Sequence, residues 1–210
     1  MFQTHGVVKV PSVLDSNTCD LLTNYIRLKA FTKRKVRNGN DPLSGVHREY
    51  GDPLMETLLS RFTPVVEQAT GLQLWPTLSF CYHYTHGNIL TPHTDRSSCE
   101  IVAGLCLGAD QEFRDNKNSW PLQIAGVENI DLDYGDMLIF RGHSMQHWRD
   151  RFNGQWFVSA ILGYVDQNGP YAFQKFDQRA HLGAKHVGMT AWYLGVLKEK
   201  LHTIIKDYSG

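Results

Sequence analysis

The hydrophobic pattern of the chain changes its period near residue 77, and this change constrains the fold more than any other feature. Between there and residue 164, three segments carry apolar side chains at every second position, as in Phe80, Tyr82 and Tyr84, and 137–140 is a short apolar run. Such alternation is typical of half-buried β-strands. The clearest strands are expected at 77–84, 99–107, 137–140 and 156–164. Short strands with turn residues between them, over roughly 90 residues, predict a β-sandwich or barrel.

Helical spacing flanks this β region. A first helix follows Asp15 or Ser16, either of which can act as its N-cap. A second helix is expected to begin at Pro53, after the capping residue Asp52, and to end at Gly71. Apolar residues at helical spacing near the C-terminus predict a third helix.

These elements predict one α+β domain over residues 1–210, with a jelly-roll-like β core at about 72–166. The N-terminal helices and the C-terminal helix, at about 190–207, are expected to pack on the outside of that core.

The composition excludes several classes of protein. Lys+Arg and Asp+Glu both number 21, and this zero net charge argues against binding to nucleic acid or anionic lipid. The chain has no apolar run long enough to span a membrane and no secretory signal, so we expect a cytoplasmic protein. Its four cysteines lack CxxC spacing and are expected to be reduced thiols.

The segment 31–51 is polar and rich in glycine, and it contains the basic run 33–37. It is interpreted either as a solvated surface loop or as a mobile lid that helps to hold an acidic group of a substrate.

The tripeptide His93-Thr94-Asp95 is the first candidate for chemistry. Ten histidines and 21 acidic residues in 210 positions produce about one H-x-[D/E] by chance, and the tripeptide 47–49 is such a rival. The position of His93 separates the two, because it directly precedes an expected strand. Residues two apart on an extended chain share a face, so His93 and Asp95 can coordinate the same metal ion.

A third ligand is expected from elsewhere in the β core. His147 lies between the expected strands 137–140 and 156–164 and begins a stretch that can itself be extended. His143 is the competing candidate, but it follows Phe140 closely, in what looks like a turn. Two histidines and one carboxylate on one face of an octahedron form the facial triad of non-haem Fe(II) oxygenases.

The order and spacing of these motifs resemble the Fe(II)/2-oxoglutarate-dependent dioxygenases, most nearly their prolyl-hydroxylase-like branch. The resemblance covers about residues 5–170 and rests on Tyr82-His83-Tyr84, Gly87, His93-Thr94-Asp95, the stretch 134–140, His147 and Gly154. It implies a double-stranded β-helix core with Fe(II) held by His93, Asp95 and His147. It also implies 2-oxoglutarate as co-substrate, O₂ as oxidant, and hydroxylation of a substrate.

One departure from the family concerns the group that binds the far carboxylate of 2-oxoglutarate. Family members often carry Arg or Lys nine or ten residues after the distal histidine, where this chain has Trp156 and Phe157. Arg149 is the first replacement candidate, because it lies two residues past His147 and so shares its face on a strand. Arg96, next to the aspartate ligand, is the second.

Each of these anchor candidates has a structural alternative. Arg149 can instead form an ion pair with Asp150 or Asp166. Tyr84 resembles a tyrosine that some members place against the co-substrate, but it can equally be a core tyrosine. Ser159 can add a hydroxyl near the same carboxylate or simply be a buried strand serine.

The sequence therefore predicts an Fe(II) dioxygenase that couples decarboxylation of 2-oxoglutarate to hydroxylation of a small molecule or peptide, such as a free or peptidyl amino acid. Two alternatives stay open: a non-catalytic metal- or ligand-binding β-barrel, and a nucleobase demethylase. Neither the substrate nor the oligomeric state follows from the sequence.

Overall fold

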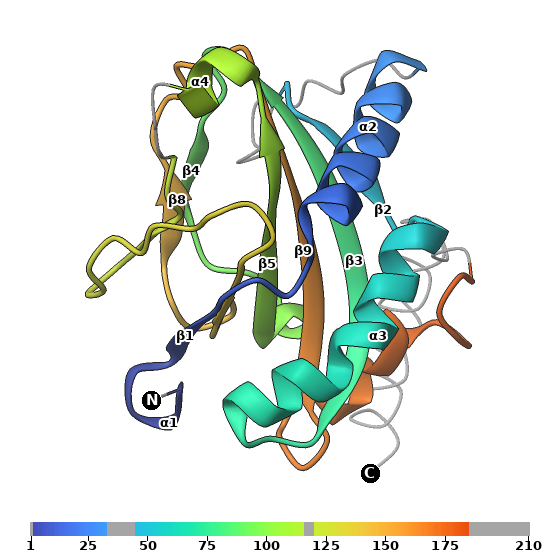
Figure 1. Ribbon diagram of the computed structural model, residues 1–210. Helices are drawn as coiled ribbons and strands as arrows, with labels where there is room; N and C mark the ends of the chain where they lie inside the picture. The colour runs from blue at the N-terminus through green and yellow to red at the C-terminus, as the bar shows by residue number, and fades with distance from the viewer. Residues whose placement is uncertain (1, 33–44, 116–119, 185–210) are drawn as a thin grey trace, which may run out of the picture.

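The computed structural model describes residues 2–32, 45–115 and 120–184 (Figure 1). The basic run 33–37, and with it most of the candidate lid, lies outside these residues, as does the helix expected at 190–207. The helices and strands are α1 (Phe2–His5), β1 (Val7–Val10), α2 (Ser16–Thr32), β2 (His47–Tyr50), α3 (Pro53–Thr70), β3 (Leu74–Thr85), β4 (Leu90–His93), β5 (Ile101–Ala109), α4 (Gln111–Asp115), β6 (Gln123–Ile124), β7 (Met137–Phe140), β8 (His147–Arg149) and β9 (Trp156–Asp166). Two 3₁₀ segments, Ser97–Cys99 and Ala172–Gln178, complete the description.

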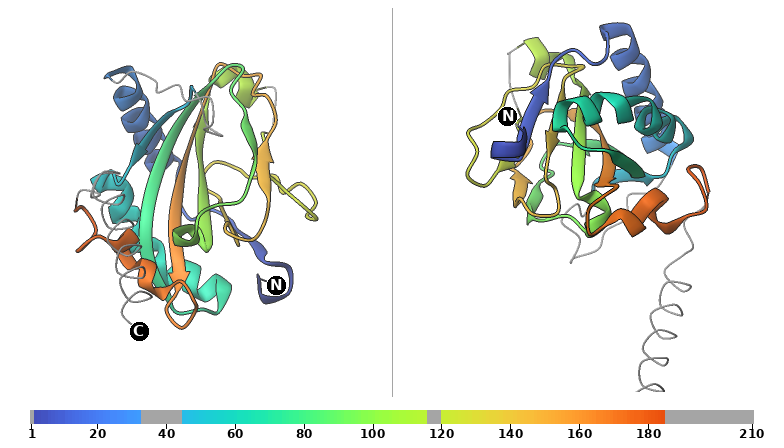
Figure 2. Two further views of the ribbon diagram at one scale, coloured as in Figure 1. Left: turned by 180° about the vertical axis from the view of Figure 1, so that it is seen from behind. Right: turned by 90° about the horizontal axis from the view of Figure 1, so that it is seen from below.

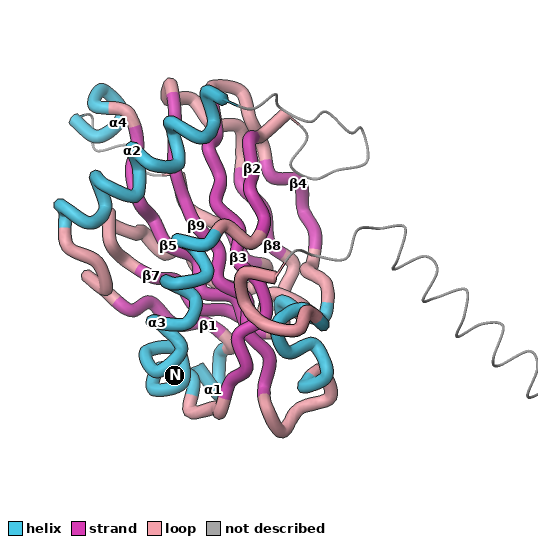
Figure 3. Tube along the Cα trace, turned by 90° about the vertical axis from the view of Figure 1, so that its right-hand side faces the viewer, coloured by secondary structure: helices cyan, strands magenta, loops and turns pink. Residues whose placement is uncertain are grey.

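The strands form two antiparallel sheets, which confirms the expected mixture of helices and sheet. The large sheet has the order β1-β7-β5-β9-β3-β2, and the small sheet has the order β4-β8-β6. Helices α2 and α3 lie on one side of the large sheet, while β4 and β8 lie on the opposite side (Figures 1 and 2). Figure 3 shows the two helices running across the large sheet. None of the helices in the described part of the chain has the length and apolarity needed to cross a membrane.

Because successive side chains alternate between the two faces of a strand, those of β5 and β9 lie on both faces of the large sheet. Odd positions of β5 and even positions of β9 pack against α2 and α3, and these are Ile101, Ala103, Leu105, Leu107, Val158, Ala160, Leu162 and Tyr164. The intervening positions face the small sheet, and these include Val102, Gly104, Cys106, Ser159 and Ile161. The helix-covered face thus forms the main core, and the opposite face is left to line a cavity.

The helix boundaries follow the expected caps. The Asp52 carboxylate accepts hydrogen bonds from the amides of Leu54 and Met55 at 2.9 and 3.3 Å, and α3 begins at Pro53. It ends before Gly71, whose φ of 72° is the left-handed conformation that favours glycine. Asp15 caps α2 by accepting from the amide of Thr18.

Two expectations about the β region were wrong in detail. The segment 31–51, expected as a loop, contains strand β2, which pairs with β3 in the register His47 to His83. The strand expected at 99–107 begins only at Ile101, because Ser97–Cys99 forms a 3₁₀ turn.

Candidate functional site

A cavity of about 480 Å³ lies between the two sheets. Its walls come from both: β2, β3, β5, β7 and β9 of the large sheet, and β4 and β8 of the small one. The residues already suspected of function gather here. His93, Asp95, Arg96, Tyr84, His147, Arg149 and Ser159 all line this cavity.

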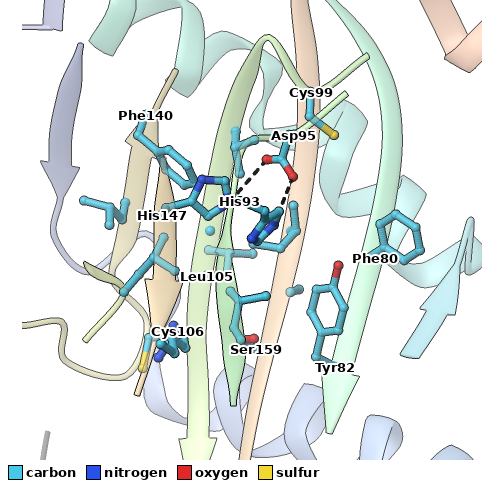
Figure 4. A pocket seen from close by; sticks show the side chains of 18 of the residues that line it. Phe80, Tyr82, His93, Asp95, Cys99, Leu105, Cys106, Phe140, His147 and Ser159 are labelled. Atoms are coloured by element: carbon cyan, nitrogen blue, oxygen red, sulfur yellow. Dashed lines mark ion pairs between the residues drawn. The ribbon is translucent and has the colours of Figure 1, made fainter. Parts of the chain in front are cut away.

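Three of these side chains converge on one point (Figure 4). His93 ends β4 and His147 begins β8, and the two stand directly opposite each other in the small sheet. Asp95 reaches them from the loop after β4, with its two carboxylate oxygens 3.6 Å from Nε2 of His93 and 3.6 Å from Nε2 of His147. One ligand atom from each residue lies within 4.8 Å of the others, which is the geometry of a candidate metal centre.

The hydrogen bonds of the two imidazoles leave the correct nitrogens free for a metal. Nδ1 of His93 lies 2.8 Å from the carbonyl oxygen of Thr91, and Nδ1 of His147 lies 2.9 Å from that of Met145. A carbonyl can only accept, so each Nδ1 carries the proton and each Nε2 keeps its lone pair. Such second contacts fix the tautomer of metal-binding histidines in general. The donor set therefore fits a divalent transition metal.

The two histidines differ in their electrostatic surroundings. Burial lowers the pKa of His147, and the nearby Asp95 carboxylate opposes this only in part. Burial also disfavours the charged form of His93, but its hydrogen bonds to Asp95 and to the Thr91 carbonyl outweigh this effect and raise its pKa. The carboxylate of Asp95 thus interacts with both rings.

Gly142 allows Asp95 to come this close. The amide of Asp95 donates to the Gly142 carbonyl at 2.9 Å. A Cβ atom at Gly142 would lie 2.5 Å from Oδ2 of Asp95, which no real side chain tolerates. The sequence indicated a turn here but gave no sign of this contact, because it depends on a residue 47 positions away.

Of the two candidates for the third ligand, only His147 lies in the cluster. His143 instead places Nδ1 2.8 Å from the carbonyl oxygen of Asp95. The other side of its ring packs edge-on against Tyr171 at 4.9 Å. His143 therefore contacts the backbone of Asp95 rather than its carboxylate.

Arg149 is partly buried and lines the cavity two residues after His147 in β8. Its guanidinium packs over the rings of Trp120 and Phe157 at 4.7 and 5.1 Å and donates a hydrogen bond to the Trp120 carbonyl. Among the described residues no carboxylate pairs with it, and Asp150 accepts instead from Gln123. Burial lowers the pKa of this guanidinium, and no carboxylate of the described residues offsets this effect.

Tyr84 and Ser159 lie near Arg149. Both are buried, at 3% and 5% exposure, on the neighbouring strands β3 and β9. Burial raises the pKa of Tyr84 to about 12, while the charge of Arg149 and a hydrogen bond with Ser159 act in the opposite direction. The phenol therefore stays protonated and can donate a hydrogen bond at neutral pH.

Arg96 is placed differently from Arg149. Its guanidinium lies 2.7 Å from the buried carboxylate of Asp177, in the 3₁₀ segment Ala172–Gln178. Arg96 thus already has an acidic partner, which Arg149 lacks among the described residues.

Two aromatic residues that the sequence analysis did not name as site residues also line the cavity. Phe80 and Tyr82 precede Tyr84 on the same face of β3 and line the cavity with it. Figure 4 shows the hydroxyl of Tyr82 pointing toward the space beside His93 and Asp95. The alternation of β3 was a sufficient signal for both, since every second residue of that strand shares one face.

Comparisons with known proteins give structural neighbours but no sequence relatives. No protein-family model and no curated protein matches the chain. A prolyl-4-hydroxylase from Pseudomonas putida aligns with a TM-score of 0.62 and 15% identity, over 79% of this chain and 95% of its own. The non-haem α-ketoglutarate-dependent epimerase SnoN from nogalamycin biosynthesis aligns at 0.65 and 16%, over 89% and 90%.

A third neighbour is HygX from Streptomyces hygroscopicus, whose structure holds nickel and 2-oxoglutarate. It aligns with a TM-score of 0.57 and 14% identity, over 80% of this chain and 85% of its own. At these identities the likeness concerns the fold. The chain has the fold of the 2-oxoglutarate/Fe(II)-dependent oxygenases, with prolyl hydroxylases among its structural neighbours.

Proposed function

We propose that this chain is a single-domain 2-oxoglutarate-dependent oxygenase with non-haem iron, and that it hydroxylates a small molecule or an amino-acid side chain. The observation that carries the proposal is the convergence of His93, Asp95 and His147, with both Nε2 atoms turned toward one carboxylate. Two imidazoles and one carboxylate that leave several coordination positions open suit Fe(II) better than a closed structural zinc site.

The two facing antiparallel sheets support a more specific description of the fold. We interpret them as the double-stranded β-helix expected from the sequence, with His93 and His147 on the small sheet, Asp95 in the loop after β4, and the cavity floor on the large sheet. This placement puts the two histidines on paired strands, whose hydrogen bonds hold them rigidly.

Fe(II) and 2-oxoglutarate, when bound, supply the activation of O₂ and the oxidative decarboxylation to succinate and CO₂. The chain's own part is to position them and to exclude water. His93, Asp95 and His147 would hold the metal. The apolar side chains Leu90, Val102, Leu138 and Phe140 around them keep the local dielectric constant low, which strengthens every polar contact inside.

Arg149 is our candidate for binding the far carboxylate of 2-oxoglutarate. The partly buried guanidinium of Arg149 has no carboxylate partner among the described residues, which is costly, and a dicarboxylate ligand would remove that cost. The planar fork of arginine matches a carboxylate with two parallel hydrogen bonds. Tyr84 and Ser159 lie close enough to Arg149 to contribute hydroxyl groups to the same end of the ligand.

The other part of the cavity is then left for the substrate. Phe80 and Tyr82 stack at 5.8 Å on one wall of the cavity and offer one phenol hydroxyl beside two ring surfaces. Such a wall suits an organic group of moderate size. Structural neighbours hold nogalamycin RO in one case and hygromycin B in another, and both are small molecules.

The test is succinate formation from 2-oxoglutarate by the purified chain with Fe(II) and O₂. We expect slow uncoupled turnover in the wild-type protein and none in Asp95→Ala. Asp136→Asn, which alters a buried aspartate outside the cavity, is the matched control and should retain turnover.

The same assay separates the alternatives. A non-catalytic β-barrel would bind metal but form no succinate at any enzyme concentration. A nucleobase demethylase would increase its succinate formation on addition of methylated oligonucleotides, whereas we expect amino acids, peptides or small cyclic metabolites to do so.

A further inference from the structure

Residues 171–178, which follow β9, pack against the loop that carries Asp95. Asp177 is the centre of this contact, with its carboxylate buried at 2% side-chain exposure. It lies 2.7 Å from the guanidinium of Arg96 and 2.6 Å from the hydroxyl of Tyr50, which donates to it. The segment thus joins β2 to the residue that directly follows Asp95.

The backbone at Asp177 adopts a conformation that residues with side chains rarely adopt. Phe176, Asp177 and Gln178 have φ angles of 54°, 55° and 59°, so three consecutive non-glycine residues are left-handed. Such a conformation persists only where the surroundings hold it, and it is concentrated at functional sites. The carboxylate of Asp177 supplies contacts that hold it here.

Two further contacts tie the same segment to the Asp95 loop. Gln174 donates from Nε2 to the hydroxyl oxygen of Ser97 at 3.1 Å. Tyr171 packs edge-on against His143, whose Nδ1 lies 2.8 Å from the carbonyl oxygen of Asp95. Residues 171–178 are therefore linked to Asp95 in two ways, through His143 and through Arg96 and Ser97, the two residues that follow it.

Asp95 needs such support more than the two histidines do. His93 and His147 are in paired strands, but Asp95 lies in a loop beyond the end of β4. Its amide is held by the Gly142 carbonyl, which fixes one point of the loop. The direction of the Asp95 carboxylate also depends on the backbone of the next residue, Arg96. The ion pair between Arg96 and Asp177 holds that residue in place.

We propose that Asp177 is a positioning residue for the metal centre, which fixes the carboxylate of Asp95 through the Arg96 ion pair and the Tyr50 hydrogen bond. This inference rests on the proposed function, since it assumes that His93, Asp95 and His147 hold a metal. It also assigns Arg96 a role in metal binding rather than in binding 2-oxoglutarate.

The test is the dissociation constant for Mn(II), measured by electron paramagnetic resonance on the full-length chain. Loss of a group that orients a metal ligand costs about 10–100-fold in metal affinity. We expect a loss of this size in Asp177→Asn. Arg96→Gln should show the same loss, and the double variant should be no worse than either single one, because both act through one pair.

Asp136→Asn is the matched control. Asp136 is also a buried aspartate, 2.7 Å from a partly exposed cation, Lys9, but it lies outside the cavity. We expect this variant to lower the melting temperature while leaving the Mn(II) affinity unchanged. The absorption spectrum of bound Co(II), which reports coordination geometry, should change in Asp177→Asn and stay unchanged in Asp136→Asn.

Tyr50→Phe tests the same role if Asp177→Asn does not fold. It removes one hydrogen bond from the Asp177 carboxylate without changing any charge, and we expect a smaller loss of Mn(II) affinity in the same direction. Unchanged Mn(II) affinity in Asp177→Asn, or in Tyr50→Phe where that variant stands in, overturns the positioning role alone. A loss of Mn(II) affinity in Asp136→Asn equal to that in Asp177→Asn also overturns the positioning role. A wild-type chain that binds no Mn(II) overturns both this role and the proposed function.

Discussion

At the scale of single residues, Arg149 is the side chain whose surroundings most require a ligand. Replacing it by Ala should weaken 2-oxoglutarate binding by hundreds-fold, because breaking a buried charge pair costs about 3–5 kcal/mol. Arg149→Lys should recover only part of this loss, since an ammonium cannot bind a carboxylate through two parallel hydrogen bonds. Calorimetric titration of 2-oxoglutarate into the Mn(II)-loaded protein measures the effect.

Arg96→Ala is the control for this experiment. With its guanidinium already paired to Asp177, Arg96 should leave 2-oxoglutarate binding intact once the metal site is saturated. If Arg96→Ala weakens 2-oxoglutarate at saturating metal and Arg149→Ala does not, the anchor has been assigned to the wrong arginine.

His143 and His147 provide a second comparison of single residues. His147→Ala should abolish Mn(II) binding, because it removes a nitrogen that faces Asp95 at 3.6 Å. His143→Ala removes the contacts to the Asp95 carbonyl and to Tyr171 but no atom that faces the Asp95 carboxylate, so it should weaken Mn(II) binding without abolishing it. Equilibrium dialysis against Mn(II) distinguishes the two variants. If His143→Ala abolishes Mn(II) binding and His147→Ala only weakens it, the third ligand is His143.

At the scale of secondary-structure elements, the N-cap of α3 offers a test of stability separate from function. Asp52→Ala removes the acceptor for two helix amides, and its carboxylate also binds Lys29 and Tyr25. We expect a loss near the upper end of the usual cost of about 0.5–2 kcal/mol, and a melting temperature several degrees lower. A calorimetric scan checks this, and an unchanged melting temperature would show that the cap contributes nothing.

The pH dependence of this cap follows from its partners. Burial alone would raise the pKa of Asp52, but Lys29, Tyr25 and the amide of Met55 together lower it. A carboxyl whose pKa is lowered by folding contributes stability above its unfolded pKa and loses it as the pH falls through its folded pKa. The difference in melting temperature between Asp52→Ala and wild type should therefore shrink only in acid.

Elements whose signal is local could be predicted from the sequence, and elements that depend on distant partners could not. The caps at Asp52 and Gly71 and the alternation of β3 and β9 each lie within one segment. Strand β2 has only four residues and owes its conformation to pairing with β3. Such short strands carry too little pattern to be recognised without their partner.

At the scale of the whole molecule, the cavity couples ligand binding to the stability of both sheets. A ligand that binds only the folded state stabilises it by about 2.7 kcal/mol at one hundred times its dissociation constant. Fe(II) or Mn(II) with 2-oxoglutarate should therefore raise the melting temperature, and a chelator should return it to the value of the metal-free protein. Differential scanning fluorimetry measures this. A melting temperature that does not respond to metal would mean that the three ligands hold none.

The site was predictable to the extent that its residues share a strand face or a motif. His93, Asp95, His147 and Arg149 came from motif spacing and period two, and the structure brings all four to one cavity. What the sequence could not reveal is the set of contacts across the fold: Gly142 against Asp95, and Asp177 against Arg96. These depend on how distant segments pack, which no local pattern encodes.

The most direct measurement is a crystal structure of the chain with Mn(II) and N-oxalylglycine, an unreactive analogue of 2-oxoglutarate. We predict one metal ion bound by Nε2 of His93, Nε2 of His147 and the carboxylate of Asp95, with the far carboxylate of the analogue against the guanidinium of Arg149. A metal ion bound by His143 instead of His147, or an analogue whose far carboxylate lies at Arg96, would contradict the account.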